Sequence, residues 1–360
     1  MRKWGIIDTK RTGEMKMAMN LVDLAEAIEN LNEEEKKALD ILIGTEKSSD
    51  SSVATLLAGM RFSEKRVCPF CSGTHVVKNG KRKDGTQKYI CRECGRNPLA
   101  TSNSILCGTH KTLTTWITFI ECELNDESLK QTAEKCGIHI NTALGWRHKL
   151  HEAVSNSEKE VRLNGEVEID ETYPVVSYKG NHIKNKDFMM PREPHKRGSQ
   201  VSKRGLSDEL LCIPCAVDDE GNVVGRSVKC GAVSYDSLHA LYSEDRIADN
   251  SIIVTDSCKA YIQLASDLKS ELIQIAAGEH SNGSYNIQRV NSFHTSFMTL
   301  INGRHRGVSS KHINGYLAWC AFKFKAASAK LKNRVVRLFG DAFSITAKII
   351  GGFDMVPVLV

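Results

Sequence analysis

The sequence lacks any long apolar run. Its longest, residues 210–217, has eight residues, far short of the about 18 needed to cross a bilayer. No apolar segment follows the initial Met-Arg-Lys-Trp, so a secretory signal is not indicated. We therefore expect a cytoplasmic protein whose 12 cysteines are metal ligands or buried thiols rather than disulfides.

Acidic residues are absent from residues 304–340, which carry nine Lys or Arg. Residues 62–96 are also basic, with nine bases against three acids, whereas residues 21–50 carry nine acids against three bases. The formal net charge is only +6, so the total charge alone does not indicate a partner. The uneven distribution favours basic faces that suit a polyanion.

Internal repeats and low-complexity tracts are also lacking, so the parts of the chain are assigned from composition and periodicity. Polar and apolar residues alternate over 166–170, which predicts a strand. Further strands are expected at 210–217, 223–230, 252–255 and 272–275, with helices between and after them. This order is typical of a mixed α/β fold. We divide the chain into an acidic helical region (1–60), a small Cys-bearing module (62–100), three helices (110–155), the mixed-sheet domain (163–335) and a C-terminal tail (336–360).

Two Cys-x-x-Cys pairs, Cys68 with Cys71 and Cys91 with Cys94, are separated by nineteen residues. Zinc prefers four ligands in a tetrahedron, and each pair supplies two thiolates from one tight turn. The spacing predicts a structural Zn²⁺ site in a ribbon that is too small to bury a core of its own. Coincidentally buried cysteines and a redox dithiol are the alternative interpretations.

Basic residues Lys81, Arg82 and Lys83 fall on the hairpin expected between the two pairs. They are candidate contacts to nucleic-acid phosphates. A hairpin tip that is merely solvated would have the same composition.

Residues 113–151 have the periodicity of three short helices, with a turn at Gly137. This pattern predicts a helix-turn-helix, whose last helix enters the DNA major groove by its N-terminal half. Asn141 is the expected cap of that helix. The candidate DNA contacts on it are Thr142, Arg147, His148 and Lys149. An ordinary three-helix bundle is the alternative.

Asp170 and Asp256 each end a predicted strand. In a mixed sheet, acids at the ends of neighbouring strands can converge, and two close carboxylates repel unless a cation lies between them. Two Mg²⁺ ions held there can activate a nucleophilic oxygen and stabilise the leaving oxygen of a phosphodiester. A structural role for either carboxylate is the alternative.

Taken together, these motifs resemble the bacterial insertion-sequence transposases of the ISXO-like type, insertion-sequence family 1595. The residues that carry the resemblance are the four cysteines, Ile169-Asp170-Glu171-Thr172-Tyr173, Lys179-Gly180-Asn181-His182, Met190-Pro191-Arg192, His195-Lys196-Arg197-Gly198, Thr255-Asp256, Val290-Asn291-Ser292-Phe293-His294, Arg306-Gly307-Val308-Ser309 and Asn314-Gly315-Tyr316-Leu317-Ala318-Trp319. The resemblance implies an RNase H-like catalytic domain with a DDE-type active site, preceded by a zinc ribbon and a helix-turn-helix.

In such an active site Asp170 and Asp256 match the first two metal ligands, for Mg²⁺ or Mn²⁺. The third position is Glu or Asn in the family, and Asn291 occupies it here. His294, one helical turn later, could share the role. The family often has a Lys two turns after the third ligand, where this sequence has Met298.

Residues 179–204 carry eight Lys or Arg and two acids, which suits an irregular loop that grips DNA through Lys196 and Arg197. A loop without specific contacts is the alternative. The resemblance implies a nucleoid-associated transposase that binds the terminal inverted repeats of its element, cleaves the DNA and joins the freed 3′-OH to target DNA. It also implies a homodimer or larger synaptic complex. The competing hypotheses are a decayed, non-catalytic DNA-binding regulator, a structure-specific nuclease, and a zinc-stabilised interaction module.

Overall fold

The computed structural model describes residue 62 and residues 66–99, 101–157, 161–180 and 201–325, with single gaps at 84, 86, 202, 244 and 280. The predictions for residues 1–60 and for the tail at 336–360 fall outside the described residues. So do Lys196 and Arg197 of the basic loop, and residues 326–335 of the expected catalytic domain.

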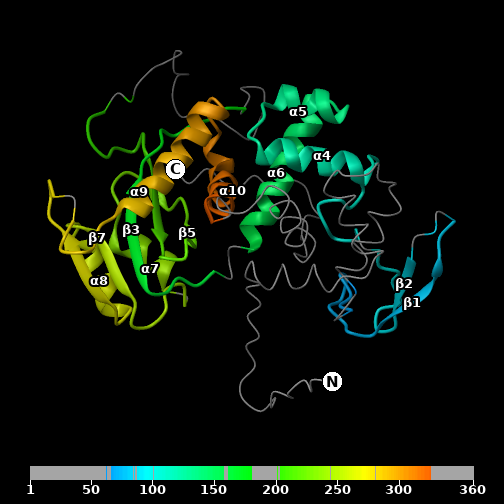
Figure 1. The fold of residues 1–360 in the computed structure, drawn as a ribbon, viewed down its shortest axis with the longest axis horizontal. Helices are drawn as coiled ribbons and strands as arrows, with labels where there is room; N and C mark the ends of the chain where they lie inside the picture. The colour runs from blue at the N-terminus through cyan, green and yellow to red at the C-terminus, as the bar shows by residue number, and fades with distance from the viewer. Residues whose placement is uncertain are drawn as a thin grey trace, which may run out of the picture.

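The Cys-bearing module is a two-stranded antiparallel ribbon (Figure 1). Strand β1 (Val76–Lys81) pairs with β2 (Gln87–Cys91), with Val76 opposite Cys91 and a register shift between Lys78 and Lys81. The ribbon buries few side chains, among them Val76 and Tyr89. Such a small apolar content leaves its stability dependent on contacts and ligands beyond the two strands.

Three helices follow the ribbon: α4 (Leu113–Leu124), α5 (Leu129–Cys136) and α6 (Ile140–Ser157). Ser128 caps α5, since its hydroxyl accepts from the Gln131 N–H while the Gln131 side chain accepts from the Ser128 N–H. Gly137 ends α5 with φ of 57°, a left-handed conformation that favours glycine. The predicted helix, turn and helix are therefore present.

The start of α6 differs from the prediction that Asn141 caps it. Helix α6 begins at Ile140, and the Asn141 N–H donates to Nδ1 of His139 at 3.2 Å. An imidazole nitrogen, two residues earlier in the chain, thus replaces the expected carboxamide oxygen as acceptor at the start of the helix.

The mixed sheet has the strand order β5-β4-β3-β7-β8 (Figure 1). Its strands are β3 (Glu166–Thr172), β4 (Leu211–Val217), β5 (Val223–Gly225), β7 (Ile252–Asp256) and β8 (Glu271–Ile275). Strands β3, β4 and β5 pair antiparallel, whereas β3, β7 and β8 pair parallel. An antiparallel meander whose first strand continues into parallel βα units is the expected RNase H-like arrangement.

The strand predicted over 223–230 is broken. Only β5 and the short β6 (Lys229–Cys230) pair with β4. The segment between β5 and β6 is one residue longer than the segment of β4 that lies opposite it. The break faces Pro214 of β4, whose ring nitrogen has no hydrogen to donate to the ladder. The missing donor is the physical reason for the interruption.

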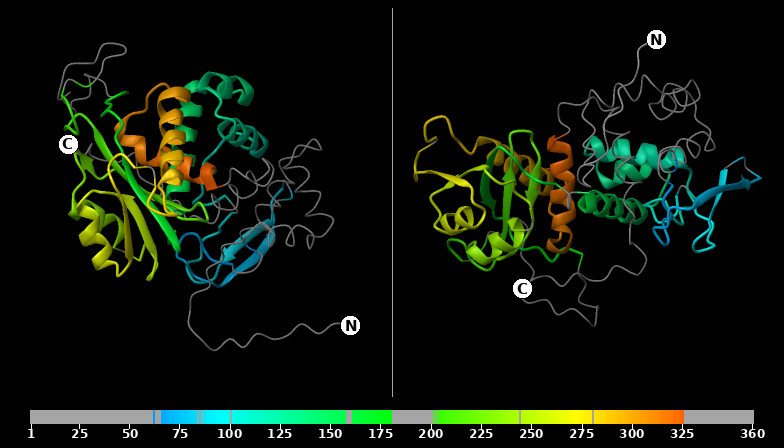
Figure 2. Two further views of the ribbon diagram at one scale, coloured as in Figure 1. Left: turned by 60° about the vertical axis from the view of Figure 1, so that its left-hand side comes forward. Right: turned by 90° about the horizontal axis from the view of Figure 1, so that it is seen from below.

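Helices cover both faces of the sheet. Helices α7 (Tyr235–Tyr242) and α8 (Ala260–Asp267) pack on one face, where Ile169 and Ile253 point. Helices α9 (Gln288–Met298) and α10 (Ile313–Lys325) pack on the other face, between the sheet and α6 (Figures 1 and 2). A π-helix, η2 (Thr299–Arg304), and a 3₁₀ turn, η3 (Ser310–His312), connect α9 to α10.

One buried apolar cluster runs from the ribbon through α4 and α6 to α9, α10 and β4. Within it the Trp116 and Trp146 rings stack at 3.7 Å, joining α4 to α6. The ribbon lies on the far side of these helices from the mixed sheet (Figure 1). Among the described residues, no helix is long and apolar enough to span a membrane.

Candidate functional site

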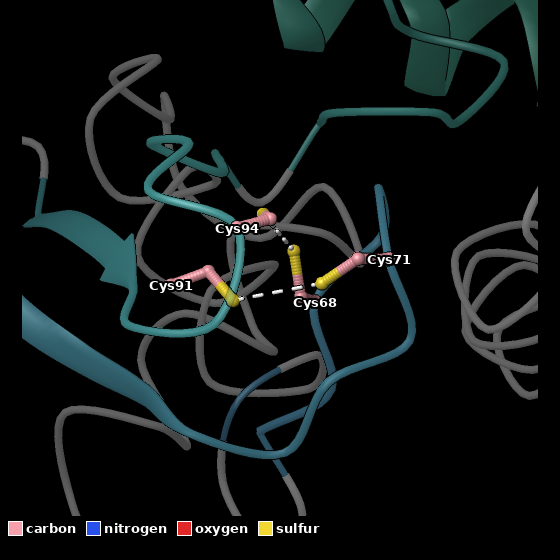
Figure 3. Close-up of side chains that lie close together, drawn as sticks. All are labelled: Cys68, Cys71, Cys91 and Cys94. Atoms are coloured by element: carbon pink, nitrogen blue, oxygen red, sulfur yellow. Dashed lines mark hydrogen bonds between the residues drawn. The ribbon is translucent and has the colours of Figure 1, made fainter.

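The four cysteines of the ribbon converge on one point (Figure 3). The Sγ atoms of Cys68 and Cys94 are 3.7 Å apart, and so are those of Cys71 and Cys91. A tetrahedron with Zn–S bonds of about 2.3 Å has S–S edges of about 3.8 Å. The geometry therefore fits a four-thiolate metal site and is far too open for disulfides, whose S–S bond is about 2.05 Å.

The thiols of the quartet differ in acidity. Burial raises the pKa of Cys68, and although a backbone hydrogen bond from Gly73 acts in the other direction, burial and the neighbouring thiols raise the pKa of Cys71 to about 12. Backbone N–H groups of Cys94 and Glu93 donate to the sulfur of Cys91 and help to lower its thiol pKa to about 7. Metal ligation requires the thiolate, so this tight turn prepares one ligand for binding.

Asp170 and Asp256 occupy neighbouring positions on β3 and β7. Asp256 is the last residue of β7, whereas β3 continues two residues beyond Asp170, past the predicted strand end. The parallel register pairs Ile169 with Thr255, which makes Asp170 and Asp256 the next positions on two adjacent strands about 4.8 Å apart. Because side chains alternate along a strand, both carboxylates emerge on the face covered by α9. The predicted convergence of the two aspartates is present in the fold.

Burial raises the pKa of Asp170 to about 6, and the neighbouring Asp256 carboxylate adds to the effect. Asp256 is held by its own turn, because its Oδ1 accepts from the Cys258 N–H at 3.0 Å. Two close carboxylates that share a partly dehydrated site are suited to a divalent cation, which would relieve both the repulsion and the burial.

Helix α9 brings the candidates for the third position to this face. Nδ1 of His294 lies 3.7 Å from Oδ2 of Asp170. Burial lowers the pKa of His294 to about 4, so the ring is neutral at pH 7 and is able to donate an electron pair to a metal. Its Nε2 is buried without a hydrogen-bond partner among the described residues. Asn291, one turn earlier, is half-buried on the same side of α9.

This arrangement is more open than the cysteine quartet. Among the described residues, only the quartet brings three or more His, Cys, Asp or Glu ligand atoms within 4.8 Å of one another. A pocket of about 410 Å³ adjoins Asp256 and reaches Ile287 at the start of α9. The exposed Glu279 also lines this pocket and adds a carboxylate to it.

Sequence reasoning missed the residues that hold α9 in place. Oε1 of Glu168 accepts from Nε of Arg289 at 2.6 Å, and Oε2 accepts from the Val290 N–H at 3.0 Å. Arg289 also pairs with Glu166. Glu168 is 1% exposed and lies two residues before Asp170 on the same face of β3. We call Glu168 and Arg289 the α9 clamp, since they join the start of α9 directly to the strand that carries Asp170.

Glu171 points to the opposite face from Asp170, as alternation along the strand requires. The Tyr261 hydroxyl of α8 donates to its Oε1. Burial raises the pKa of Glu171 to about 7, even though this hydrogen bond acts in the other direction. Glu171 therefore links β3 to α8 on the face of the sheet opposite Asp170.

The predicted DNA contacts occupy different environments. Lys81, Arg82 and Lys83 are exposed at the hairpin tip, and Thr142 is exposed near the start of α6. Lys149 is half-buried, and His148 is half-buried with its ring stacked on His312 at 3.9 Å.

Arg147 was predicted to contact DNA, but its side chain is only 2% exposed, so this prediction is wrong. It forms a bidentate ion pair with Glu123 of α4, with Nε–Oε2 and Nη2–Oε1 distances of 2.7 Å. Its Nη1 is 3.1 Å from Nδ1 of His305, which follows η2 in the sheet domain. Arg147 therefore links modules inside the protein rather than presenting its charge to DNA.

Comparison with known proteins shows which family the sheet domain resembles. Residues 162–325 match the family of ISXO2-like transposase domains. An uncharacterised protein in the transposable element ISH50 of Halobacterium salinarum is 24% identical over 272 residues, covering 75% of this chain and 88% of that protein.

Solved structures of the Mos1 transposase show a more distant likeness. The Mos1 mariner paired end complex with Mn has a TM-score of 0.28 and 14% identity, covering 65% of this chain and 77% of that one. The Mos1 strand transfer complex has a TM-score of 0.27 and 12% identity, covering 65% and 76%. Likeness at this level carries no argument about the activity of the present chain.

Proposed function

We propose that this chain is the DNA transposase of an insertion sequence, and that it both cleaves its element ends and joins them to target DNA. The observation that carries the proposal is the placement of Asp170 and Asp256 at neighbouring positions of β3 and β7, within a segment that matches the ISXO2-like transposase domains. The occurrence of the Halobacterium salinarum relative in a transposable element supports the same assignment.

The chemistry consists of two phosphoryl transfers. In the first, water attacks a phosphorus atom at the element end, the P–O3′ bond breaks, and a free 3′-OH results. In the second, that 3′ oxygen attacks a phosphorus atom of target DNA, one phosphodiester bond replaces another, and the target 3′ oxygen leaves with a proton. Neither step needs an enzyme-linked intermediate or an external energy source.

The residues suit a pair of hard divalent cations. Asp170 and Asp256 supply carboxylate oxygens, and Asn291 supplies an amide oxygen, which are ligands that Mg²⁺ and Mn²⁺ accept. His294 offers a neutral ring nitrogen, which suits Mn²⁺ better than Mg²⁺. Bound cations would lower the pKa of the attacking hydroxyl and stabilise the leaving oxygen. The role of the chain is to hold these ligands, exclude bulk water from one side and position α9 through the α9 clamp.

The other modules would recognise DNA. Exposed Lys81, Arg82 and Lys83 suit contacts to phosphates, and Thr142 at the start of α6 suits contact with base edges. Lys149, Lys196 and Arg197 are further proposed phosphate contacts. A structural Zn²⁺ held by the cysteine quartet would keep the basic hairpin folded. Because transposition joins two ends, we expect a dimer or larger complex on DNA.

The test is a strand-cleavage and joining assay with purified protein, the DNA that flanks its gene, and Mg²⁺ or Mn²⁺. Asp256→Asn keeps the size of the side chain but removes the charge, and should abolish nicks at the element ends and joined products. Asp249→Asn, at an exposed aspartate outside the site, should retain both. Metal-dependent nicks that persist in Asp256→Asn would refute the assignment of the site.

One observation favours a second candidate, a non-catalytic DNA-binding regulator. Helix α9 carries no acidic residue over its described length, so Asn291 and His294 stand where a third carboxylate would bind a cation more strongly. Sequence-specific DNA binding by the wild-type protein without any metal-dependent cleavage would favour this candidate. Nicks without joined products would instead indicate a nuclease.

A further inference from the structure

A groove of about 1050 Å³ lies between the helix-turn-helix and the transposase domain. Helices α5 and α6 form one wall, through residues such as Ser128 and Leu144. The loop between η2 and α10 forms the other wall. The position of one wall relative to the other is fixed because α6 packs along α10, as Figure 2 shows. A ligand in this groove would contact both modules at once.

The groove is strongly basic. Lys179, Arg304, Arg306 and Lys311 line it, all with side chains that are exposed or half-buried. Two carboxylates oppose them. Asp126 is already paired with Lys323 at 2.6 Å, and Glu152 is exposed. Arg147 also lines the groove, but its charge is balanced by Glu123. Positive charge is therefore in excess, and an anionic ligand is favoured.

Arg306 has an unusual backbone. Its φ is +52°, in the left-handed region where Gly or Asn is favoured and a long side chain is uncommon. The Lys179 ammonium stabilises this turn by donating to the carbonyl oxygens of Arg306, at 3.2 Å, and Gly307, at 2.7 Å. Among the described residues, neither Arg304 nor Arg306 forms an ion pair. Both guanidinium groups line the groove without a carboxylate from the described residues to neutralise them, which leaves them available to an anionic ligand.

Arg304 ends the π-helix η2, a rare backbone form that occurs often at functional sites. The histidines that line the same wall do not add charge. Burial lowers the pKa of His312 to about 4 and that of His305 to about 3, so both rings are neutral at pH 7. The attraction for anions thus comes from the Lys and Arg side chains and is constant over the neutral pH range.

We propose that this groove binds the phosphodiester backbone of the element-end DNA, between the bases that α6 reads and the strand that is cut at Asp170 and Asp256. The inference rests on the proposed function, because it takes the ligand to be the transposase's own DNA. Its consequence is that the spacing between recognised sequence and cut site is set by contacts in the groove.

The test measures how the affinity of the full chain for an element-end duplex depends on salt. The slope of log K against log salt is negative, and each lost phosphate contact reduces its magnitude by about 0.9. Arg306→Asn should lower it by about 0.9, and Arg304→Gln with Arg306→Asn by about 1.8. Lys269→Asn is the matched control, since Lys269 has φ of +51°, is exposed and lies outside the groove. It should leave the slope unchanged.

The variants should lose affinity for a scrambled duplex of equal length by the same factor as for the element-end duplex, because phosphate contacts are independent of sequence. If the variants keep the wild-type slope while the wild-type protein binds and cleaves, the groove inference is overturned and the proposed function stands. If the wild-type protein binds no DNA, both fail. Should Arg306→Asn not fold, as tryptophan fluorescence would reveal, Arg304→Gln alone decides the question.

Discussion

Removing the Arg147 side chain tests whether Arg147 contacts DNA or forms an internal ion pair. The substitution Arg147→Met keeps much of the side-chain volume and removes the charge. It leaves the Glu123 carboxylate, 1% exposed, without the guanidinium that satisfies both of its oxygens. It also removes the donors to the Glu127 carbonyl oxygen and to His305.

The magnitude follows from the burial of both partners. Breaking a buried ion pair by removing one partner costs about 3–5 kcal/mol, because an uncompensated charge stays in a medium that solvates it poorly. Replacing both partners by apolar side chains is often close to neutral. We therefore expect Arg147→Met to be destabilised by about 3–5 kcal/mol, and the double variant with Glu123→Leu to recover most of the loss.

The assay is urea unfolding followed by tryptophan fluorescence, since Trp116 and Trp146 stack between α4 and α6 beside this pair. Lys149→Met on the same helix is the matched control and should change the free energy of unfolding by less than about 0.5 kcal/mol. The reasoning would be refuted if Arg147→Met unfolded like the wild-type protein but bound DNA with a lower salt slope. That pattern belongs to an exposed phosphate contact.

Three further predictions follow from the other sites. Cys94→Ser should lose the bound zinc that metal analysis finds in the wild-type protein, whereas Cys107→Ser, at an exposed cysteine outside the quartet, should keep it; equal zinc in both variants would contradict the assignment. Burial lowers the pKa of His312 to about 4, below the about 6.5 of an unfolded chain, so its contribution to stability is complete above about pH 6.5 and is lost as the pH falls towards 4. His312→Phe should flatten the pH dependence of urea unfolding in that range. Glu168→Gln should cost about 1.5–3 kcal/mol, because it weakens a buried and a partly buried hydrogen bond that hold the start of α9. An unchanged melting temperature would show that the α9 clamp is not needed.

Local periodicity predicts most of the sheet, because each strand carries its own pattern. The alternation around Ile169 and the short apolar run around Ile253 locate β3 and β7. Asp256 ends its strand as predicted, but β3 continues two residues beyond Asp170. The break between β5 and β6 was not predictable from its own residues. It depends on Pro214 of the partner strand, and pairing between strands is not visible in a local pattern.

The cysteine quartet was predictable because its ligand spacing is local and its chemistry demands four thiolates. Arg147 was mispredicted for the opposite reason. A basic residue on an exposed-looking helix resembles a DNA contact, and its partner Glu123 lies 24 residues away. The α9 clamp joins residues 121 positions apart, and its one local sign is the acidic side chain of Glu168 on the same face of β3 as Asp170.

The way the modules are joined has a consequence for how such a protein would use DNA. Modules connected by flexible linkers sample many separations, so the distance from recognised sequence to cut site would vary. Here α6 shares one buried cluster with α10, and polar links from Arg147 to His305 and from Lys323 to Asp126 cross the same boundary. A displacement of α6 relative to the sheet would expose apolar surface and break buried charge contacts together. The separation between α6 and the aspartate pair is therefore a property of the fold, which is what cleavage at a constant distance from a recognised sequence requires.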